Sequence, residues 1–205
     1  MALASSENGG VRTGFFGLSK ASQWAVTIAA TVLSTYALDA VATVAGLGLA
    51  ASGLLQGLGH MQVLLFLAAT YLIWGLGLHA NLKANWALLL DTGTSTNALS
   101  KAAHDLMKLR TASLRARRFA AAVGYTGTEL AKEAPYYAGA FGAVLFTDSV
   151  SANDAIIFLG GANLGAAVYE YGLARLVRAF LRFAPRTEDI KRAAIEAARD
   201  GKRLR

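Results

Sequence analysis

A long, almost uncharged stretch, Ala21–Leu82, constrains the fold of this chain more than any other feature. Asp39 is the one residue in it with a full charge. A helix needs roughly 20 mainly apolar residues to cross a bilayer, so this stretch is long enough for two crossings. Its centre, residues 46–59, is rich in glycine, which suits a tight reversal of the chain. We therefore expect a hairpin of two membrane-spanning helices, at about Ser22–Val44 and about His60–Ala80.

The composition favours a membrane protein over a soluble domain. Charged residues make up 16% of the chain and hydrophobic residues 55%, whereas soluble domains carry about 25% charged residues. There is no cysteine, which excludes disulfides, thiolate metal sites and cysteine nucleophiles. The net charge of +7 comes from basic residues that flank the apolar runs. We therefore expect the partner of these charges to be the lipid bilayer and not nucleic acid.

Two further apolar segments predict two more crossings, at about Phe119–Phe146 and about Ala155–Leu176. The turn between them, Thr147–Asp154, contains acids and no basic residue. Before the third span, Ala98–Arg118 places apolar residues at helical spacing on one face and basic residues on the other, which predicts an amphipathic helix at the cytoplasmic surface. Residues 183–205 form a basic tail, in which we expect a short helix.

The expected fold is an all-α polytopic membrane protein. It has a cytoplasmic N-terminal segment (1–20), a four-helix membrane domain (21–182) and a basic cytoplasmic tail (183–205). With the exception of Lys132, the Lys and Arg residues lie before the first span, between the second and third spans, or near and beyond the end of the fourth. Four crossings with both termini in the cytoplasm therefore satisfy the positive-inside rule. The bacterial inner membrane is the expected location, and an organellar membrane is the alternative.

The third predicted span is unusual because it carries Glu129, Lys132 and Glu133. Residues three and four apart share one face of a helix. Glu129 lies about a dozen residues beyond the basic residues that precede the span, or roughly 18 Å along the axis. If the whole segment crosses, these charges must face protein, pair with one another or contact water. In the alternative, Phe119–Glu133 lies along the membrane surface and Ala134–Val150 alone crosses.

A small ion or proton channel or transporter is the first functional hypothesis, because acids within spanning helices are costly and usually functional. The tentative ion pathway consists of Asp39, Glu129, Lys132, Glu133 and Glu170. Two of these residues have simpler interpretations. Asp39 could be hydrated near the outer interface, and Glu170 could pair with nearby arginines of the final helix. A protomer of four helices is small for enclosing an ion pathway by itself, so we expect a homo-oligomer.

A non-catalytic subunit that scaffolds or assembles a larger membrane complex is the second hypothesis. In that case the charges of the third span would pair with another chain. The final span also carries a predicted helix-packing face, formed by Gly161, Asn163, Gly165 and Gly172, because small residues let helix backbones approach closely. This face serves either an oligomer interface or packing against a helix of the same chain.

Catalysis, cofactors and metal binding are not expected. The sequence contains no phosphate-binding loop, dinucleotide-binding glycine motif or zinc-protease motif. His60 and His79 lie at opposite ends of the second predicted span, roughly 28 Å apart at 1.5 Å per residue, so they cannot share a metal or haem within one chain. We therefore predict that the protein is not an enzyme.

Overall fold

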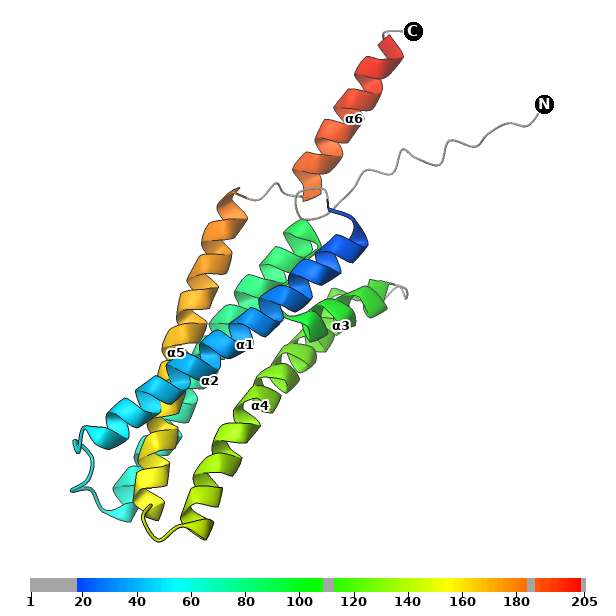
Figure 1. Cartoon of the computed structure of the whole chain (residues 1–205). Coiled ribbons are helices and arrows are strands. Elements are labelled where there is room, and N and C mark those ends of the chain that lie inside the picture. Colours follow the sequence, from blue (N-terminus) through cyan, green and yellow to red (C-terminus); the bar gives the residue numbers. More distant parts are fainter. Residues whose placement is uncertain (1–17, 109–112, 184–186, 204–205) are drawn as a thin grey trace.

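The computed structural model describes residues 18–108, 113–183 and 187–203, and within these ranges the fold is all-helical, as predicted (Figure 1). The helices are α1 (Lys20–Ala51), α2 (His60–Thr92), α3 (Ala98–Lys108), α4 (Leu114–Phe146), α5 (Ala152–Phe183) and α6 (Thr187–Arg203).

Three helices, α1, α2 and α5, are long and apolar enough to cross a membrane. They have 32, 33 and 32 residues, which corresponds to about 48 Å at 1.5 Å per residue. The hydrocarbon core of a bilayer is about 30 Å thick. These helices make the chain compatible with an integral membrane location. α4 is equally long, with 33 residues, but carries too many charges to belong to this apolar class. Length and composition thus support three of the four predicted spans.

The long helices lie side by side along the bundle (Figure 1). The start of α1 and the ends of α2 and α5 lie toward one end, together with α3 and the start of α4. The α1–α2 and α4–α5 turns lie at the opposite end, and their sequences contain no Lys or Arg. We call the first end the basic end, because the segments that meet there carry most of the Lys and Arg of the chain.

α5 is the central helix, and it packs along α1 and α2. Small residues make these contacts close. A Cβ atom on Gly165 would lie 2.7 Å from Ala45 Cβ and 2.8 Å from the carbonyl oxygen of Val41, both on α1. A Cβ atom on Gly160 would lie 2.1 Å from the ring of Phe66 on α2. The main buried apolar cluster joins the three helices and consists of Leu38, Ala42, Trp74, Ala162, Ala166 and Ala167.

The end of α2 corrects a prediction. The second span was expected to finish near Ala80, but the helix continues to Thr92. No glycine or proline interrupts the sequence between Gly77 and Gly93, so no local signal stops the helix earlier. Gly93 ends it in a left-handed conformation, with φ +72°, and its N–H donates to the carbonyl oxygen of Leu89 at 3.0 Å.

The predicted single helix over Ala98–Arg118 is also wrong. α3 and α4 are separate helices, and residues 109–112 between them lie outside the described residues. Each helix has its own N-cap. Asn97 Oδ1 accepts from Ser100 N at 2.9 Å, and the Ser113 hydroxyl oxygen accepts from Ala116 N at 3.3 Å. The buried Ser100 hydroxyl donates to the carbonyl oxygen of Ala121 at 3.0 Å, so α3 packs against α4.

The remaining helices follow the prediction more closely. α1 and α5 contain the predicted spans 22–44 and 155–176, but extend beyond them at both ends. This is expected, because a hydropathy pattern identifies the part that crosses the bilayer, whereas a helix continues until a cap or glycine ends it. α6 carries Glu188 and Asp189 in its first turn and extends beyond the basic end (Figure 1).

Candidate functional site

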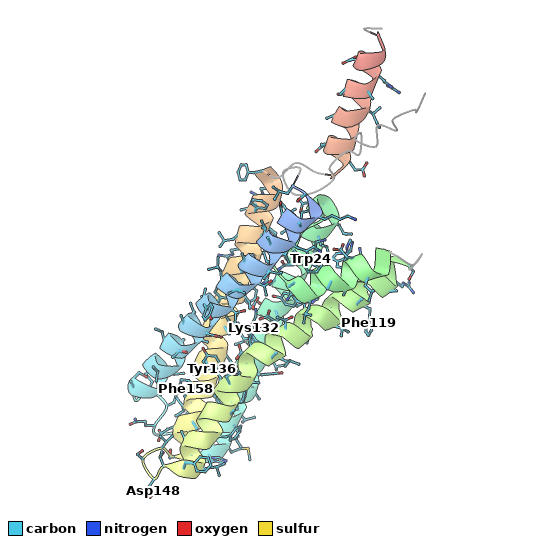
Figure 2. All side chains as sticks on the ribbon, turned by 45° about the vertical axis from the view of Figure 1, so that its right-hand side comes forward. Trp24, Phe119, Lys132, Tyr136, Asp148 and Phe158 are labelled. Atoms are coloured by element: carbon cyan, nitrogen blue, oxygen red, sulfur yellow. The ribbon has the colours of Figure 1, made fainter. Side chains whose placement is uncertain are left out.

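Four acidic side chains and one lysine come together in the middle part of the bundle. α4 contributes Glu129, Lys132 and Glu133, α5 contributes Glu170, and α1 contributes Asp39. We call these five residues the acid cluster. Glu129 and Glu133 are each 2% exposed and Glu170 is 1% exposed. Figure 2 shows Lys132 well inside the length of the bundle. The structure thus brings together all the residues of the tentative pathway.

Helical spacing creates the first interaction of the acid cluster. Glu129 and Lys132 are three residues apart on α4 and therefore share one face. Lys132 Nζ lies 2.7 Å from Glu129 Oε1, within hydrogen-bonding distance. Both side chains are buried, with 8% of Lys132 and 2% of Glu129 exposed. The ion pair forms within the chain, which is one of the alternatives that the sequence left open.

Glu170 receives hydrogen bonds from two other helices. Asn81 Nδ2 on α2 donates to Glu170 Oε2, and the hydroxyl of Tyr125 on α4 donates to the same oxygen at 2.9 Å. The predicted alternative, pairing with arginines of the final helix, is not what the structure contains, because Arg175 and Arg178 are exposed. Arg178 Nε donates to the carbonyl oxygen of Ala174 instead. The buried carboxylate therefore has two polar donors, neither of which is positively charged.

The acid cluster has more negative than positive groups. Its carboxyl groups interact electrostatically with one another, Glu170 with both Glu129 and Glu133, and Glu133 with Asp39. Among the described residues, Glu129 Oε2, Glu133 Oε1 and Asp39 Oδ1 are buried oxygens without a hydrogen-bond partner. A buried ionised carboxylate without a partner costs several kcal/mol. One lysine cannot neutralise four acids, so the cluster is suited to taking up protons or cations.

A chain of polar side chains leads from Glu170 toward the basic end. Beyond Asn81, Asn85 Nδ2 donates to Asn81 Oδ1 at 2.6 Å. Asn85 Oδ1 accepts from the hydroxyl and the backbone N–H of Thr96, the latter at 3.0 Å. The hydroxyl of Thr31 on α1 donates to the carbonyl oxygen of Thr96 at 2.6 Å. We call Asn81, Asn85 and Thr96 the polar ladder. It connects the acid cluster with the loop that follows α2.

The polar ladder is not among the predicted site residues. Asn81 and Asn85 lie just beyond the predicted end of the second span, near Ala80, yet both are buried within α2. The signal was present, because two asparagines four residues apart share one face of a helix that is otherwise mainly apolar. The contribution of Thr96 had no such signal, since it depends on the loop folding back between α1 and α2.

The histidines do not form a metal site among the described residues. No group of three or more His, Cys, Asp or Glu side chains in that part of the chain is placed to hold a metal ion. His60 Nδ1 lies 2.7 Å from Asn153 Oδ1 at the end opposite the basic end. His79 is exposed, whereas His104 is buried beside the ring of Trp86, with 6.1 Å between the ring centroids.

The predicted helix-packing residues have different environments. Gly161 and Gly165 are buried against α1 of the same chain, where an added Cβ atom would collide with backbone atoms. Asn163 is buried on the same helix, and its Nδ2 has no hydrogen-bond partner among the described residues. Gly172 faces open space. Packing within the chain therefore accounts for Gly161 and Gly165.

Comparison of the chain with protein families, curated proteins and solved structures gives no match. The geometry of the acid cluster and the polar ladder is therefore the basis for assigning a function.

Proposed function

We propose that the protein is a small membrane channel or transporter that moves protons or cations through the acid cluster. The observation that carries this proposal is the excess of buried acids over Lys132, together with the unpartnered oxygens of Glu129 and Glu133. Such a carboxylate is stabilised when it takes up a proton or binds a cation. Reversible uptake at acids within spanning helices is the elementary step of many proton and ion pathways.

In this proposal α4 also crosses the membrane, as the third of four spanning helices. Its 33 residues are long enough to cross the bilayer. Its charged face is covered by protein, while apolar residues such as Leu130 and Phe141 are 51% and 58% exposed, as lipid-facing residues would be. An ionisable helix face that is buried inside a bundle is compatible with a membrane span. With the basic end in the cytoplasm, both termini are cytoplasmic, and the bacterial inner membrane is the proposed location.

The polar ladder supplies a proposed route between the acid cluster and the cytoplasmic side. A proton or cation from the loop after α2 would reach Glu170 along Asn81 and Asn85, with water completing the route. It would then pass to Glu129 and Glu133, whose carboxyl groups interact electrostatically with Glu170. Asp39, on the far side of Glu133, would be the last acid before the opposite end. Lys132 would set the charge that the cluster carries at rest.

A non-catalytic membrane subunit is the second candidate, but the contacts of the acid cluster favour transport. The subunit hypothesis expects the charges of α4 to pair with a partner chain, whereas Lys132 bonds to Glu129 of its own chain. Glu170 also finds its donors within the chain. We retain the homo-oligomer as part of the proposal. Extraction in mild detergent, followed by mass measurement, should yield a homo-oligomer, whereas stoichiometric foreign partners would favour the subunit.

Flux measurements in liposomes test the proposed function. The variants Glu129→Gln and Glu133→Gln keep the side-chain volume but remove the ionisable group. We expect each to reduce proton flux, or cation flux if the cargo is a cation, at least about tenfold, which corresponds to about 1.4 kcal/mol in the barrier. A pH-sensitive dye inside the liposomes reports protons, and ion-selective dyes report cations. Glu196→Gln on α6 is the control, because this exposed residue lies outside the cluster. Wild-type flux in both cluster variants would refute the proposal.

Single-cysteine labelling tests the four-span arrangement. Because the natural sequence has no cysteine, each variant carries one reactive thiol. Asp148→Cys, in the α4–α5 turn, should react with a membrane-impermeant maleimide from outside intact cells. Ala198→Cys, on α6, should react only after the membrane is opened. Both positions are exposed in the structure, so access depends on the side of the membrane. Labelling of both from the same side would contradict the proposed topology.

A further inference from the structure

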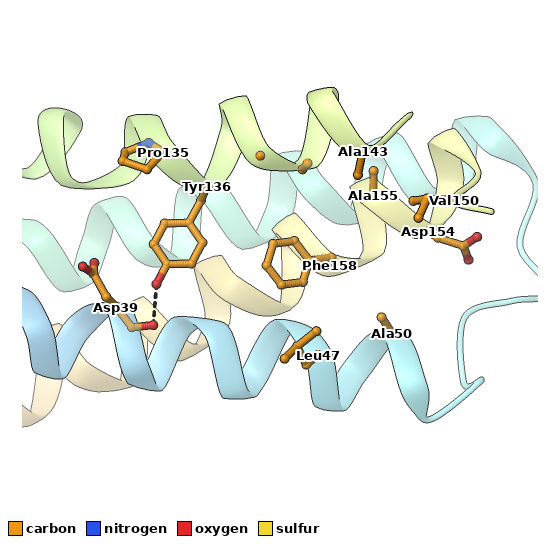
Figure 3. Close-up of a pocket in the computed structure, with 12 residues that line it drawn as sticks. Asp39, Leu47, Ala50, Pro135, Tyr136, Ala143, Val150, Asp154, Ala155 and Phe158 are labelled. Atoms are coloured by element: carbon orange, nitrogen blue, oxygen red, sulfur yellow. Dashed lines mark hydrogen bonds between the residues drawn. The ribbon is translucent and has the colours of Figure 1, made fainter. Parts of the chain in front are cut away.

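An apolar groove runs between α1 and α4, with α5 between them (Figure 3). Its volume is about 620 Å³, within the range of about 300–1,000 Å³ that is typical of small-molecule sites. Most of its wall consists of small or apolar side chains from the three helices and the α4–α5 turn. They include Leu47, Ala50, Gly139, Ala140, Ala143 and Val150.

Two acidic residues and two aromatic residues also line the groove. Asp39 and Asp154 lie toward its two ends, and Tyr136 and Phe158 lie between them (Figure 3). The two rings are stacked, with centroids 6.4 Å apart and planes inclined by 23°. The lining contains no Lys or Arg. Asp39 Oδ1 is buried and has no hydrogen-bond partner among the described residues. The groove thus carries a carboxylate at each end and an aromatic pair between them.

We propose that this groove binds an amphipathic organic cation, such as a quaternary ammonium, a phosphonium or a protonated amine with an aromatic or aliphatic body. The carboxylate of Asp39 attracts the charged centre of the ligand. The faces of Tyr136 and Phe158 add cation–π attraction. The apolar walls cover the body of the ligand, which provides the hydrophobic part of the binding energy.

The charges around Asp39 agree with this choice of ligand. Lys132 and Glu133 both interact with Asp39 electrostatically. The ammonium of Lys132, however, is hydrogen-bonded to Glu129 at 2.7 Å, and Lys132 is not part of the groove lining. A lipid acyl chain would fit the apolar walls but would place no charge beside the two aspartates that line the groove. An anion would be repelled by both aspartates. A cation with an apolar body matches both the negative charge and the apolar walls of the groove.

The interaction between Asp39 and Glu133 gives this site a part in transport, an inference that rests on the proposed function. A cation bound at Asp39 would favour the ionised form of Glu133, so that cation binding and proton release are coupled. The groove would then exchange an organic cation for protons of the acid cluster. Binding itself requires no flux and can be tested separately.

Binding of tetraphenylphosphonium tests the groove. The full-length protein in detergent micelles is titrated with this lipophilic cation and the heat of binding is measured. We expect saturable binding, weakened at least about tenfold by Asp39→Asn, equivalent to about 1.4 kcal/mol. Asp148→Asn is the matched control, because this exposed aspartate lies outside the groove. Equal affinity in Asp39→Asn would overturn the proposal and indicate a groove for lipid chains. Competitive binding of the anion tetraphenylborate would also overturn it.

A second pair of variants keeps the test decisive if Asp39→Asn folds poorly. Gly139 lines the groove and a Cβ atom there would meet no other atom within 4 Å, so we expect the leucine of Gly139→Leu to occupy part of the groove. Gly127→Leu is the matched control on the same helix, because it also faces open space but lies outside the groove. We expect Gly139→Leu alone to lose tetraphenylphosphonium binding at least about tenfold. Unchanged binding would refute the site. Binding without any flux would instead refute the proposed transport function and leave the site intact.

Discussion

Replacing Lys132 with methionine is expected to lower the free energy of unfolding by about 3–5 kcal/mol, the usual cost of breaking a buried ion pair by removing one partner. Methionine has a similar length and volume, so the change removes mainly the charge. The Lys132 side chain is 8% exposed, and it supplies the cation that faces Glu129 at 2.7 Å. Without it, the buried acids have no compensating positive group inside the cluster. Unfolding in mixed micelles, followed by circular dichroism, measures the loss.

A double variant separates the effect of charge from that of packing. Glu129→Gln combined with Lys132→Met removes both partners, so no unpaired charge is created at this position. We expect it to be more stable than Lys132→Met alone, because replacing both members of a buried pair is often close to neutral. The coupling energy follows from the double-mutant cycle. If the single and double variants unfold together, the ion pair does not stabilise the bundle.

Replacing Gly165 with leucine is expected to separate α1 from α5 and to cost about 3 kcal/mol, the upper end of the usual range for overpacking. A Cβ atom at this position would already lie 2.8 Å from the carbonyl oxygen of Val41 and 2.7 Å from Ala45 Cβ. A backbone atom cannot move aside as a flexible side chain can, so the helices must shift. The same unfolding measurement in mixed micelles reports the change.

Gly172→Leu is the matched control for this prediction. Gly172 lies on the same helix, two turns further on, but an added Cβ atom would meet nothing within 4 Å. Leucine there should face open space and leave the free energy of unfolding within about 0.5 kcal/mol of wild type. If both variants were as stable as wild type, close approach at Gly165 would not be required. If both were destabilised by the same amount, the cause would be a general effect of leucine on α5.

The acid cluster shows which parts of the candidate site can be predicted from local sequence. The contact between Glu129 and Lys132 follows from helical spacing alone, because residues three apart always share a face. The position of Asp39 and Glu170 beside them did not follow. Both were proposed for the pathway because acids are unusual in apolar segments. The rarity of acids in apolar segments identifies candidate residues, but it does not indicate which of them lie close together in the fold.

The polar ladder and the groove lay beyond the sequence analysis altogether. Asn81 lies beyond the predicted end of the second span, and its contact with Glu170 joins residues on two helices far apart in sequence. The groove depends on how α4 sits beside α1, with small residues between them. Neither feature has a local signal strong enough to compete with a simpler interpretation. The predicted end of the second span, near Ala80, is wrong for a related reason: it follows the apolar run along the sequence, whereas the helix continues to Thr92.

The sequence by itself determined that the chain is helical and compatible with a membrane, and which face of α4 carries its charges. Hydropathy and helical periodicity are properties of neighbouring residues, so both can be read along the chain. Only the tertiary structure decided that Asp39, Glu170 and Asn81 surround that face. It also decided that Gly165 packs within the chain. The reason is that contacts between helices depend on side-chain shape across a packed interface, where a glycine or a methyl group decides how closely two backbones approach.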